Sequence, residues 1–290
     1  MQNKKLWLLS LILIFTLSAC QNDDSAKGKE EPGESNTATE QNENQTNDNQ
    51  EDSQKQNQQE NQDDEKQEEE SNEQENNEKN IPDRFENEVP DENGIITVLE
   101  PKATDIVVNK KRKLPDGYVP PNLVYPDIPF SFDEKIDKRK MRKVAAGPIE
   151  ELFKGAEEAG IDLVAVSGYR SYATQKAIFN RNVQQNGEEH AKMYSAMPGH
   201  SEHQTGLTMD VSTVAVTFQL VEDFRETEEG AWLAKHAHEY GFIIRYPKGK
   251  EDITGYAYEP WHIRYVGKEM ATEIYEQQLT LEEYFNLYPN

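Results

Sequence analysis

The feature that most limits what this chain can fold into is the composition of residues 21–80. Of these sixty residues only Ala26 and Ala38 are hydrophobic, and the segment holds 20 Asp and Glu against 5 Lys. A segment with so little apolar surface cannot offset the entropy lost on ordering its backbone. We therefore expect 21–80 to be a disordered acidic tether rich in Gln, Asn and Glu. Any folded part must be built from residues 81–290, which is enough for one domain.

The first 20 residues have the layout of a secretory signal peptide. Lys4 and Lys5 precede an apolar run from Leu6 to Leu17, which is shorter than the roughly 20 residues of a membrane span. The segment ends in Leu-Ser-Ala-Cys, and Cys20 is the only cysteine. This ending resembles a bacterial lipobox, in which the cysteine is diacylated. We expect a lipoprotein anchored through Cys20 to the extracytoplasmic face of the cell membrane; an ordinary cleaved signal with an incidental cysteine is the alternative.

Charge and cysteine content exclude several classes of protein. The formal net charge is −24, and residues 81–290 alone carry −11, which disfavours nucleic acid as a partner. One cysteine cannot form an internal disulfide framework or a cysteine-rich zinc site. We expect a monomer, although the sequence does not determine the oligomeric state.

Helices and short strands are mixed in the rest of the chain. Residues 81–135 are expected to form an extended N-terminal arm with short strands at 94–99 and 105–109, although a prodomain is an alternative. From 136 to 290 the pattern predicts helices at 136–159, 172–185, 228–240, 267–277 and 280–287, and strands at 162–167, 209–212, 242–246 and 261–265. Pro148 should kink the first helix or begin a second one, and Ser171 is placed to cap the next. Without strict βαβ alternation, this order predicts an α+β domain.

Two short stretches carry the chemistry. Residues 201–210 read S-E-H-Q-T-G-L-T-M-D, and residues 259–262 read E-P-W-H. Together they supply two imidazoles and an aspartate, which suit a catalytic Zn²⁺ that keeps one position open for water. His203, Asp210 and His262 are the predicted ligands of one Zn²⁺ per chain, and Glu259 is placed to take a proton from the water. His200 is the strongest alternative ligand.

Arg170 is a further candidate because it directly follows a predicted buried strand, where side chains reach into clefts. Its guanidinium suits a carboxylate or a developing oxyanion. A structural salt bridge is the alternative role.

The motifs in this order resemble the S-x-H-x-x-G-x-x-x-D and E-x-x-H pair of the VanY-type D-alanyl-D-alanine carboxypeptidases. This zinc peptidase group includes D-Ala-D-Ala dipeptidases and L,D-carboxypeptidases. S-G-Y-R-S-Y at 167–172, with Gln175, is similar to the family's upstream substrate motif, and the resemblance covers roughly 110–285. It implies a small mixed or antiparallel sheet flanked by helices, with zinc in a cleft, as in hedgehog-like folds.

The resemblance also implies a role for each site residue. The zinc ligands would be His203, Asp210 and His262, and the catalytic base would be Glu259. Arg170 would stabilise the tetrahedral intermediate or bind the terminal carboxylate. The predicted substrate contacts are Gln175, Ser201 and Tyr169.

The implied activity is removal of the C-terminal D-alanine from peptidoglycan stem peptides. D,D specificity is preferred and L,D specificity is possible, because both need a site for a terminal D-Ala carboxylate. A lipid anchor and a polar tether would place the domain at this substrate outside the membrane. The alternatives are a non-catalytic wall-binding lipoprotein and a peptidoglycan endopeptidase of the same fold.

Overall fold

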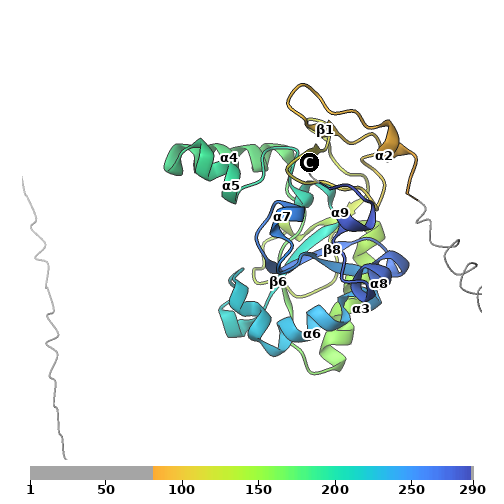
Figure 1. Cartoon of the computed structure of the whole chain (residues 1–290). Coiled ribbons are helices and arrows are strands. Elements are labelled where there is room, and N and C mark those ends of the chain that lie inside the picture. Colours follow the sequence, from red (N-terminus) through yellow and green to blue (C-terminus); the bar gives the residue numbers. More distant parts are fainter. Residues whose placement is uncertain (1–80, 289–290) are drawn as a thin grey trace, which may run out of the picture. The chain divides into compact units, whose positions relative to one another are not determined.

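A four-stranded antiparallel sheet lies at the centre of the folded part of the chain (Figure 1). The computed structural model describes residues 81–288. In spatial order the strands are β5 (Val164–Ser167), β6 (Thr208–Ser212), β8 (Glu259–Tyr265) and β7 (Phe242–Tyr246). All neighbouring pairs are antiparallel, and helices flank the sheet. The predicted α+β class with a small antiparallel sheet is confirmed.

Alternation along β6 gives the sheet an apolar face and a polar face. Met209 and Val211 belong to the main hydrophobic cluster. Thr208, Asp210 and Ser212 therefore point to the opposite face, because successive side chains of a strand alternate. All five are buried, so the polar face is covered by other parts of the chain.

Pairing between β6 and β8 brings two distant motifs together. Asp210 lies directly opposite His262 in the antiparallel register. On β8, Ile263 belongs to the apolar cluster, which leaves His262 and Arg264 on the polar face beside Asp210. One face of two neighbouring strands thus gathers residues that are 52 positions apart.

Helices cover the apolar face. Helix α3 (Lys143–Glu158) contributes Ile149 and Leu152, and α6 (Glu228–His236) contributes Leu233, to the cluster that contains Met209. On the other face, where Ile243 of β7 lies opposite Arg264, helices α8 (Lys268–Glu276) and α9 (Leu281–Tyr284) build a second cluster around Ile243.

The remaining elements are short or peripheral. Figure 1 shows α4 and α5 projecting to one side of the sheet. The α-helices are α2 (Arg84–Asn87), α4 (Tyr172–Asn186), α5 (Glu188–Tyr194) and α7 (Glu251–Thr254). The 3-10 helices are η1 (Asp137–Arg139), η2 (Glu202–Thr205), η3 (Val214–Val216), η4 (Glu222–Glu226) and η5 (Ala237–Tyr240). The small sheets are parallel β1 (Ile96–Thr97) with β2 (Arg112–Lys113), and antiparallel β3 (Leu123–Val124) with β4 (Met141–Arg142).

The first predicted long helix begins later than its apolar spacing suggests. Residues 136–142 form η1 and β4, and α3 starts at Lys143. Pro148 lies within α3 and does not begin a second helix. Gly147 explains this tolerance, because a residue without a Cβ avoids the clash that proline imposes on its predecessor in helical conformation.

The strand predicted at 105–109 is wrong. Ile106, Val107 and Val108 are fully buried, but they pair with no strand in the described part of the chain. The partner of β1 is instead β2, a few residues later. The apolar run predicted burial correctly, whereas ladder pairing depends on which backbone lies alongside.

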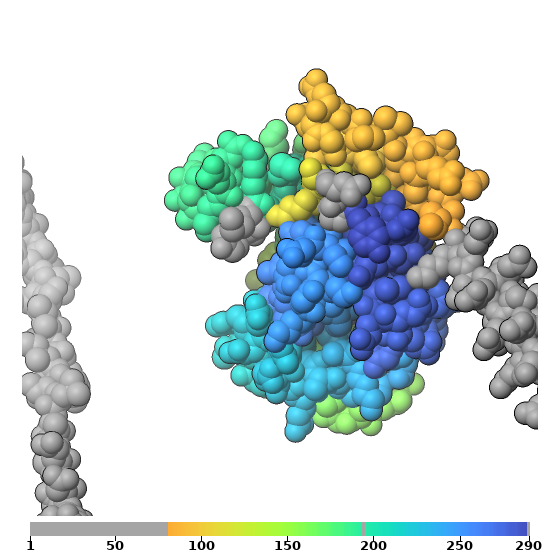
Figure 2. Space-filling view, viewed as in Figure 1, coloured from red at the N-terminus to blue at the C-terminus, as the bar shows by residue number. Residues whose placement is uncertain are grey.

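The segment before β4 packs against the sheet and the C-terminal helices. Arg264 of β8 donates from Nη2 to the carbonyl oxygens of Thr104 and Ile106, at 2.9 and 2.7 Å. Asn109 donates from Nδ2 to Glu282 Oε1 of α9 at 3.0 Å. Figure 2 shows the same arrangement at the surface, with the N-terminal part of the described chain, in orange, against the dark-blue C-terminal part.

Residues 1–80 lie outside the described residues. The predicted signal peptide, the lipid attachment at Cys20 and the tether therefore remain predictions. Within 81–288, no helix is long and apolar enough to cross a membrane.

Candidate active site

His203, Asp210 and His262 form a buried cluster on the polar face of the sheet. One ligand atom from each residue lies within 4.8 Å of the other two. His203 Nε2 is 3.2 Å from Asp210 Oδ2, and His262 Nδ1 is 2.9 Å from Asp210 Oδ1. The three side chains come from η2, β6 and β8, so the cluster depends on the β6–β8 register.

A backbone carbonyl fixes the tautomer of His203. Its Nδ1 lies 2.7 Å from the carbonyl oxygen of Gly168, just after β5. A carbonyl only accepts hydrogen bonds, so Nδ1 carries the hydrogen and Nε2 presents its lone pair to Asp210. Two acceptors that face each other at 3.2 Å require a cation or a proton between them.

The donor set fits Zn²⁺. Ligand atoms that sit about 2.0–2.1 Å from a tetrahedral zinc ion are about 3.3 Å apart. The nitrogens of His203 and His262 lie at similar distances, 3.2 and 2.9 Å, from the Asp210 oxygens. His262 Nε2 is buried and has no hydrogen-bond partner, whereas Nδ1 of the same ring points to Asp210. Two imidazoles and one carboxylate from separate elements leave the remaining coordination positions to water or substrate.

The local field favours a positive charge at the cluster. Burial opposes the ionisation of Asp210, but His203 and His262 outweigh it and hold the pKa of Asp210 well below its usual range. Burial likewise opposes protonation of His262, yet its hydrogen bond with Asp210 and the nearby carboxylates of Glu202 and Glu259 raise its pKa to about 9. A metal cation would sit in the same field.

Glu259 lies at the first position of β8, beside the cluster. Its Oε2 is 3.6 Å from His262 Nδ1. Burial raises the pKa of Glu259 to about 7; His262 opposes this rise and the negative charge of Asp210 adds to it. A carboxylate that titrates near neutrality is suited to take up and return a proton.

The cluster opens into a cavity of about 250 Å³. The predicted residues Arg170, Gln175, Ser201 and Glu259 all line it, together with His203 and His262. Residues from three segments of the chain, 170–175, 201–203 and 259–262, therefore meet at one hollow, where a ligand would contact both metal-binding and charged groups.

Gln175 holds Arg170 in place. Arg170 Nη1 donates to Gln175 Oε1 at 3.0 Å, and Gln175 Nε2 donates to the carbonyl oxygen of Ala196 at 2.6 Å. Both polar atoms of the amide are therefore engaged within the protein. This geometry gives Gln175 a positioning role beside its predicted contact with substrate.

The other two predicted substrate contacts lie differently. Ser201 is buried and lines the cavity, directly before η2. Tyr169 is also buried but is not among the residues around the cavity; its backbone N–H donates to the carbonyl oxygen of Lys140 at 2.7 Å. Only Ser201 of the two is thus placed to touch a ligand there.

Sequence reasoning missed several residues of the cavity, among them Tyr246, Tyr256 and Glu202. Tyr246 lies with its ring centroid 4.9 Å from that of His262. Tyr256 donates from its hydroxyl to the carbonyl oxygen of His200 at 3.3 Å. Glu202 lies between two predicted residues, but one glutamate in an acidic sequence gives no signal of burial. Each position depends on tertiary packing.

His200, the alternative ligand, lies outside the cluster and contacts a backbone carbonyl. Its Nδ1 lies 2.9 Å from the carbonyl oxygen of Asn109. His236 stacks on Trp232, and His238 stacks on Tyr275. None of these three histidines belongs to the cluster.

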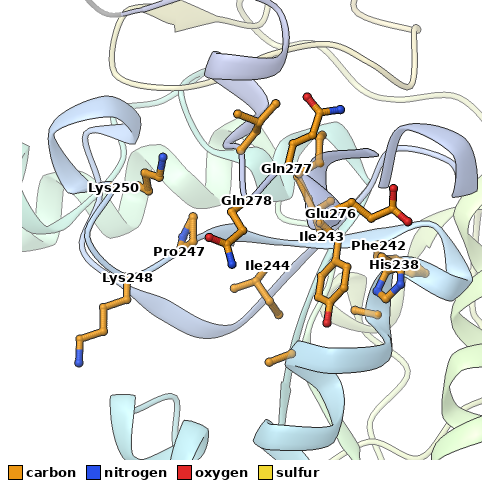
Figure 3. A pocket seen from close by; sticks show the side chains of 15 residues that line it. His238, Phe242, Ile243, Ile244, Pro247, Lys248, Lys250, Glu276, Gln277 and Gln278 are labelled. Carbon is orange, nitrogen blue, oxygen red and sulfur yellow. The ribbon is translucent and has the colours of Figure 1, made fainter. Parts of the chain in front are cut away.

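A larger hollow of about 760 Å³ lies away from the cluster, along β7 and α8 (Figure 3). Its wall combines apolar residues such as Ile244 and Pro247 with Lys248, Gln277 and Gln278. It includes neither the His–Asp–His cluster nor Glu259. The chemistry therefore resides in the smaller cavity.

A buried two-histidine, one-aspartate cluster beside a glutamate of raised pKa defines a metallohydrolase site. Residues 138–268 match the family described as VanY: D-alanyl-D-alanine carboxypeptidase. The chain is 50% identical over 206 residues, 71% of its length, to the putative carboxypeptidase YodJ of Bacillus subtilis (strain 168), and covers 76% of that protein. It belongs to the VanY-type family of zinc carboxypeptidases.

Solved structures agree with this assignment. A structure of the LD-carboxypeptidase LdcB is similar with a TM-score of 0.66 and 51% identity, covering 69% of this chain and 94% of that one. The vancomycin-resistance D,D-pentapeptidase VanY in complex with Zn(II) gives a TM-score of 0.52 and 33% identity, covering 63% and 99%. The chain is a metallo-carboxypeptidase, and its His–Asp–His cluster fits the family's zinc.

Proposed function

We propose that this chain removes the C-terminal D-alanine from peptidoglycan stem peptides. The observation that carries the proposal is that the cluster of His203, Asp210 and His262 borders a small cavity that Glu259 and Arg170 also line. A cavity of about 250 Å³ suits the end of a peptide better than its middle. This size favours a carboxypeptidase over an endopeptidase, which needs an open groove.

His203, Asp210 and His262 would hold Zn²⁺, which when bound polarises a carbonyl and lowers the pKa of water. Glu259 accepts a proton from the attacking water and passes it to the amine of the leaving D-alanine. Arg170, held by Gln175, pairs with the terminal carboxylate or stabilises the oxyanion.

The sequence motifs led us to expect D,D specificity; we infer instead that the tetrapeptide is the better substrate, which is L,D specificity. The chain is more similar to the LD-carboxypeptidase LdcB, at 51% identity, than to the D,D-pentapeptidase VanY, at 33%. Both specificities need a site for a terminal D-alanine, so the difference must lie in contacts with the residue before it.

The test is to incubate the full chain, purified in detergent and supplied with Zn²⁺, with tetrapeptide and pentapeptide muropeptides. Mass spectrometry should show loss of one alanine, faster from the tetrapeptide. Glu259→Ala should lower the rate by at least about a hundredfold, because general acid–base catalysis contributes that much. Its zinc content should stay unchanged. Release of D-alanine from neither peptide would disprove the activity, and internal cleavage would indicate an endopeptidase.

We also propose that the enzyme is a lipoprotein on the extracytoplasmic face of the cell membrane. The support is the Leu-Ser-Ala-Cys ending of a signal-like segment, followed by an acidic tether at 21–80. A tether of sixty flexible residues reaches roughly 45 Å. Cys20→Ser should move the protein out of the membrane fraction, and unchanged retention would count against lipid attachment.

A further inference from the structure

Glu202 is a carboxylate buried in the middle of the zinc-binding motif. It stands between Ser201 and His203 at the start of η2, and its side chain is fully buried. Burying a charge without partners is strongly unfavourable. The environment of Glu202 must therefore supply both counter-charges and hydrogen bonds.

Two buried arginines occupy one oxygen of this carboxylate. Arg245 Nε donates to Glu202 Oε1 at 2.8 Å, and Arg264 Nη1 donates to the same oxygen at 2.5 Å. The arginines come from β7 and β8, and both side chains are fully buried. They fix the plane and position of the carboxylate.

The second oxygen faces a zinc-ligand candidate. Thr208 Oγ1 donates to Glu202 Oε2 at 3.2 Å. The same Oε2 lies 3.6 Å from His262 Nε2, a buried nitrogen with no hydrogen-bond partner. Glu202 thus has one acceptor oxygen aimed at the side of the imidazole opposite Asp210.

Each arginine also forms hydrogen bonds with a more distant part of the described chain. Arg245 Nη1 and Nη2 donate to the two carboxylate oxygens of Glu282 in α9, at 2.8 and 2.6 Å. Arg264 Nη2 donates to the carbonyl oxygens of Thr104 and Ile106. Two carboxylates and two guanidiniums balance in formal charge, so Glu202 is held by an internally neutral network.

We propose that Glu202 is the positioning residue for His262, accepting its Nε2–H so that the Nδ1 lone pair is directed at the metal. This inference rests on the proposed role of His262 as a zinc ligand. A carboxylate behind a ligating imidazole fixes the tautomer and ring orientation and raises the basicity of the ligand. The carbonyl of Gly168 performs the corresponding task for His203.

A merely structural role for Glu202 would be to neutralise Arg245 and Arg264. A variant of Glu282 distinguishes this structural role from the proposed positioning of His262. Glu282 is fully buried, binds Arg245 through two hydrogen bonds and also accepts one from Asn109. Within residues 81–288, none of its hydrogen bonds or ion pairs involves His262. Glu282→Gln therefore disturbs the same charge network without touching the metal cluster.

The experiment measures the zinc dissociation constant of the full chain by competition with a fluorescent chelator. The variants are Glu202→Gln, Glu282→Gln and His262→Ala, and urea denaturation of the metal-free proteins gives their stability. We expect Glu202→Gln to weaken zinc binding by about 10- to 100-fold. Glu282→Gln should stay within about threefold of the wild type, since the ligand shell is unchanged. Equal zinc affinity in the wild type and Glu202→Gln would overturn the inference, as would equal weakening in both glutamate variants.

His262→Ala distinguishes a failure of the proposed ligand set from a failure of the proposed role of Glu202. If it binds zinc as tightly as the wild type does, the proposed ligand set fails. If it loses zinc while Glu202→Gln does not, only the role of Glu202 fails. Zinc affinity does not depend on which peptide is cleaved, so an error in substrate leaves this test intact.

A spectrum of the wild type keeps the inference testable if Glu202→Gln does not fold. Long-range nitrogen–proton correlation in the zinc-loaded, ¹⁵N-histidine-labelled protein reports which ring nitrogen of His262 carries hydrogen. Assignment follows from the signals that disappear in His262→Ala. A protonated Nε2 is expected, and a protonated Nδ1 would refute the proposed orientation.

Discussion

Replacing Gly168 with alanine tests how tightly the backbone behind His203 is packed. A Cβ at Gly168 would lie 2.5 Å from the carbonyl oxygen of Lys140 and 2.9 Å from Met209 Cε. The first separation is about 0.8 Å short of an ordinary C···O contact of roughly 3.3 Å. The Gly168 N–H donates to Lys138 at 2.6 Å, and the Lys140 carbonyl accepts from Tyr169 at 2.7 Å, so neither backbone can move freely.

We expect Gly168→Ala to destabilise the metal-free protein by about 1–3 kcal/mol, the usual cost of overpacking. For a urea m-value of about 2 kcal/mol/M, the unfolding midpoint should fall by about 0.5–1.5 M. Urea titration followed by tryptophan fluorescence, with a chelator present, measures this shift. An unchanged midpoint would show that the backbone around Gly168 shifts to accommodate the Cβ, and would refute the inference that this backbone is rigid.

Gly155→Ala is the matched control. Its new Cβ would meet an atom at a shorter distance, but that atom belongs to a mobile side chain and not to the backbone. Its Cβ would lie 2.0 Å from the hydroxyl of Tyr240, the far end of a half-buried side chain that can rotate. Alanine in place of glycine within α3 gains up to about 0.8–1 kcal/mol of helix propensity. Displacing Tyr240 from its contact with Trp232, at 6.3 Å, loses about 0.5–1.5 kcal/mol. The net change should be close to zero, and a loss as large as that of Gly168→Ala would refute the distinction between rigid and mobile neighbours.

Three further predictions concern the elements around the site. Ser171→Ala removes the side chain that accepts from the Thr174 N–H at the start of α4 and should cost about 1 kcal/mol in urea denaturation, whereas Ser171→Gly should cost only a few tenths. A larger loss for glycine would contradict the capping role. Gln175→Ala frees Arg170 and should lower kcat/KM for D-alanine release by about tenfold, the loss of about 1.4 kcal/mol from one charge-assisted hydrogen bond. Its zinc content should be unchanged, and lost zinc would show that the effect is not on Arg170. Chelation should abolish activity and lower the melting temperature, and adding Zn²⁺ should restore both; activity that persists without metal would contradict the zinc mechanism.

Local sequence patterns determined several secondary-structure elements of this protein. Ser171 predicted a helix start, and the side chain caps α4 as expected. The alternation around Asp210 predicted a strand, which β6 is. Such features depend on residues within a few positions of one another, so hydrogen bonding and side-chain period express them directly. The two motifs also identified the chemical groups of the metal cluster.

Other features were decided only by the tertiary structure. The β6–β8 register places Asp210 opposite His262, and no local pattern specifies which strands become neighbours. The burial of Glu202 depends on Arg245 and Arg264, which lie 43 and 62 positions away. A charged residue is stabilised in the interior only where distant counter-charges meet it. The sequence therefore predicted the three residues of the cluster, whereas long-range packing placed Glu202 and its two arginines around them.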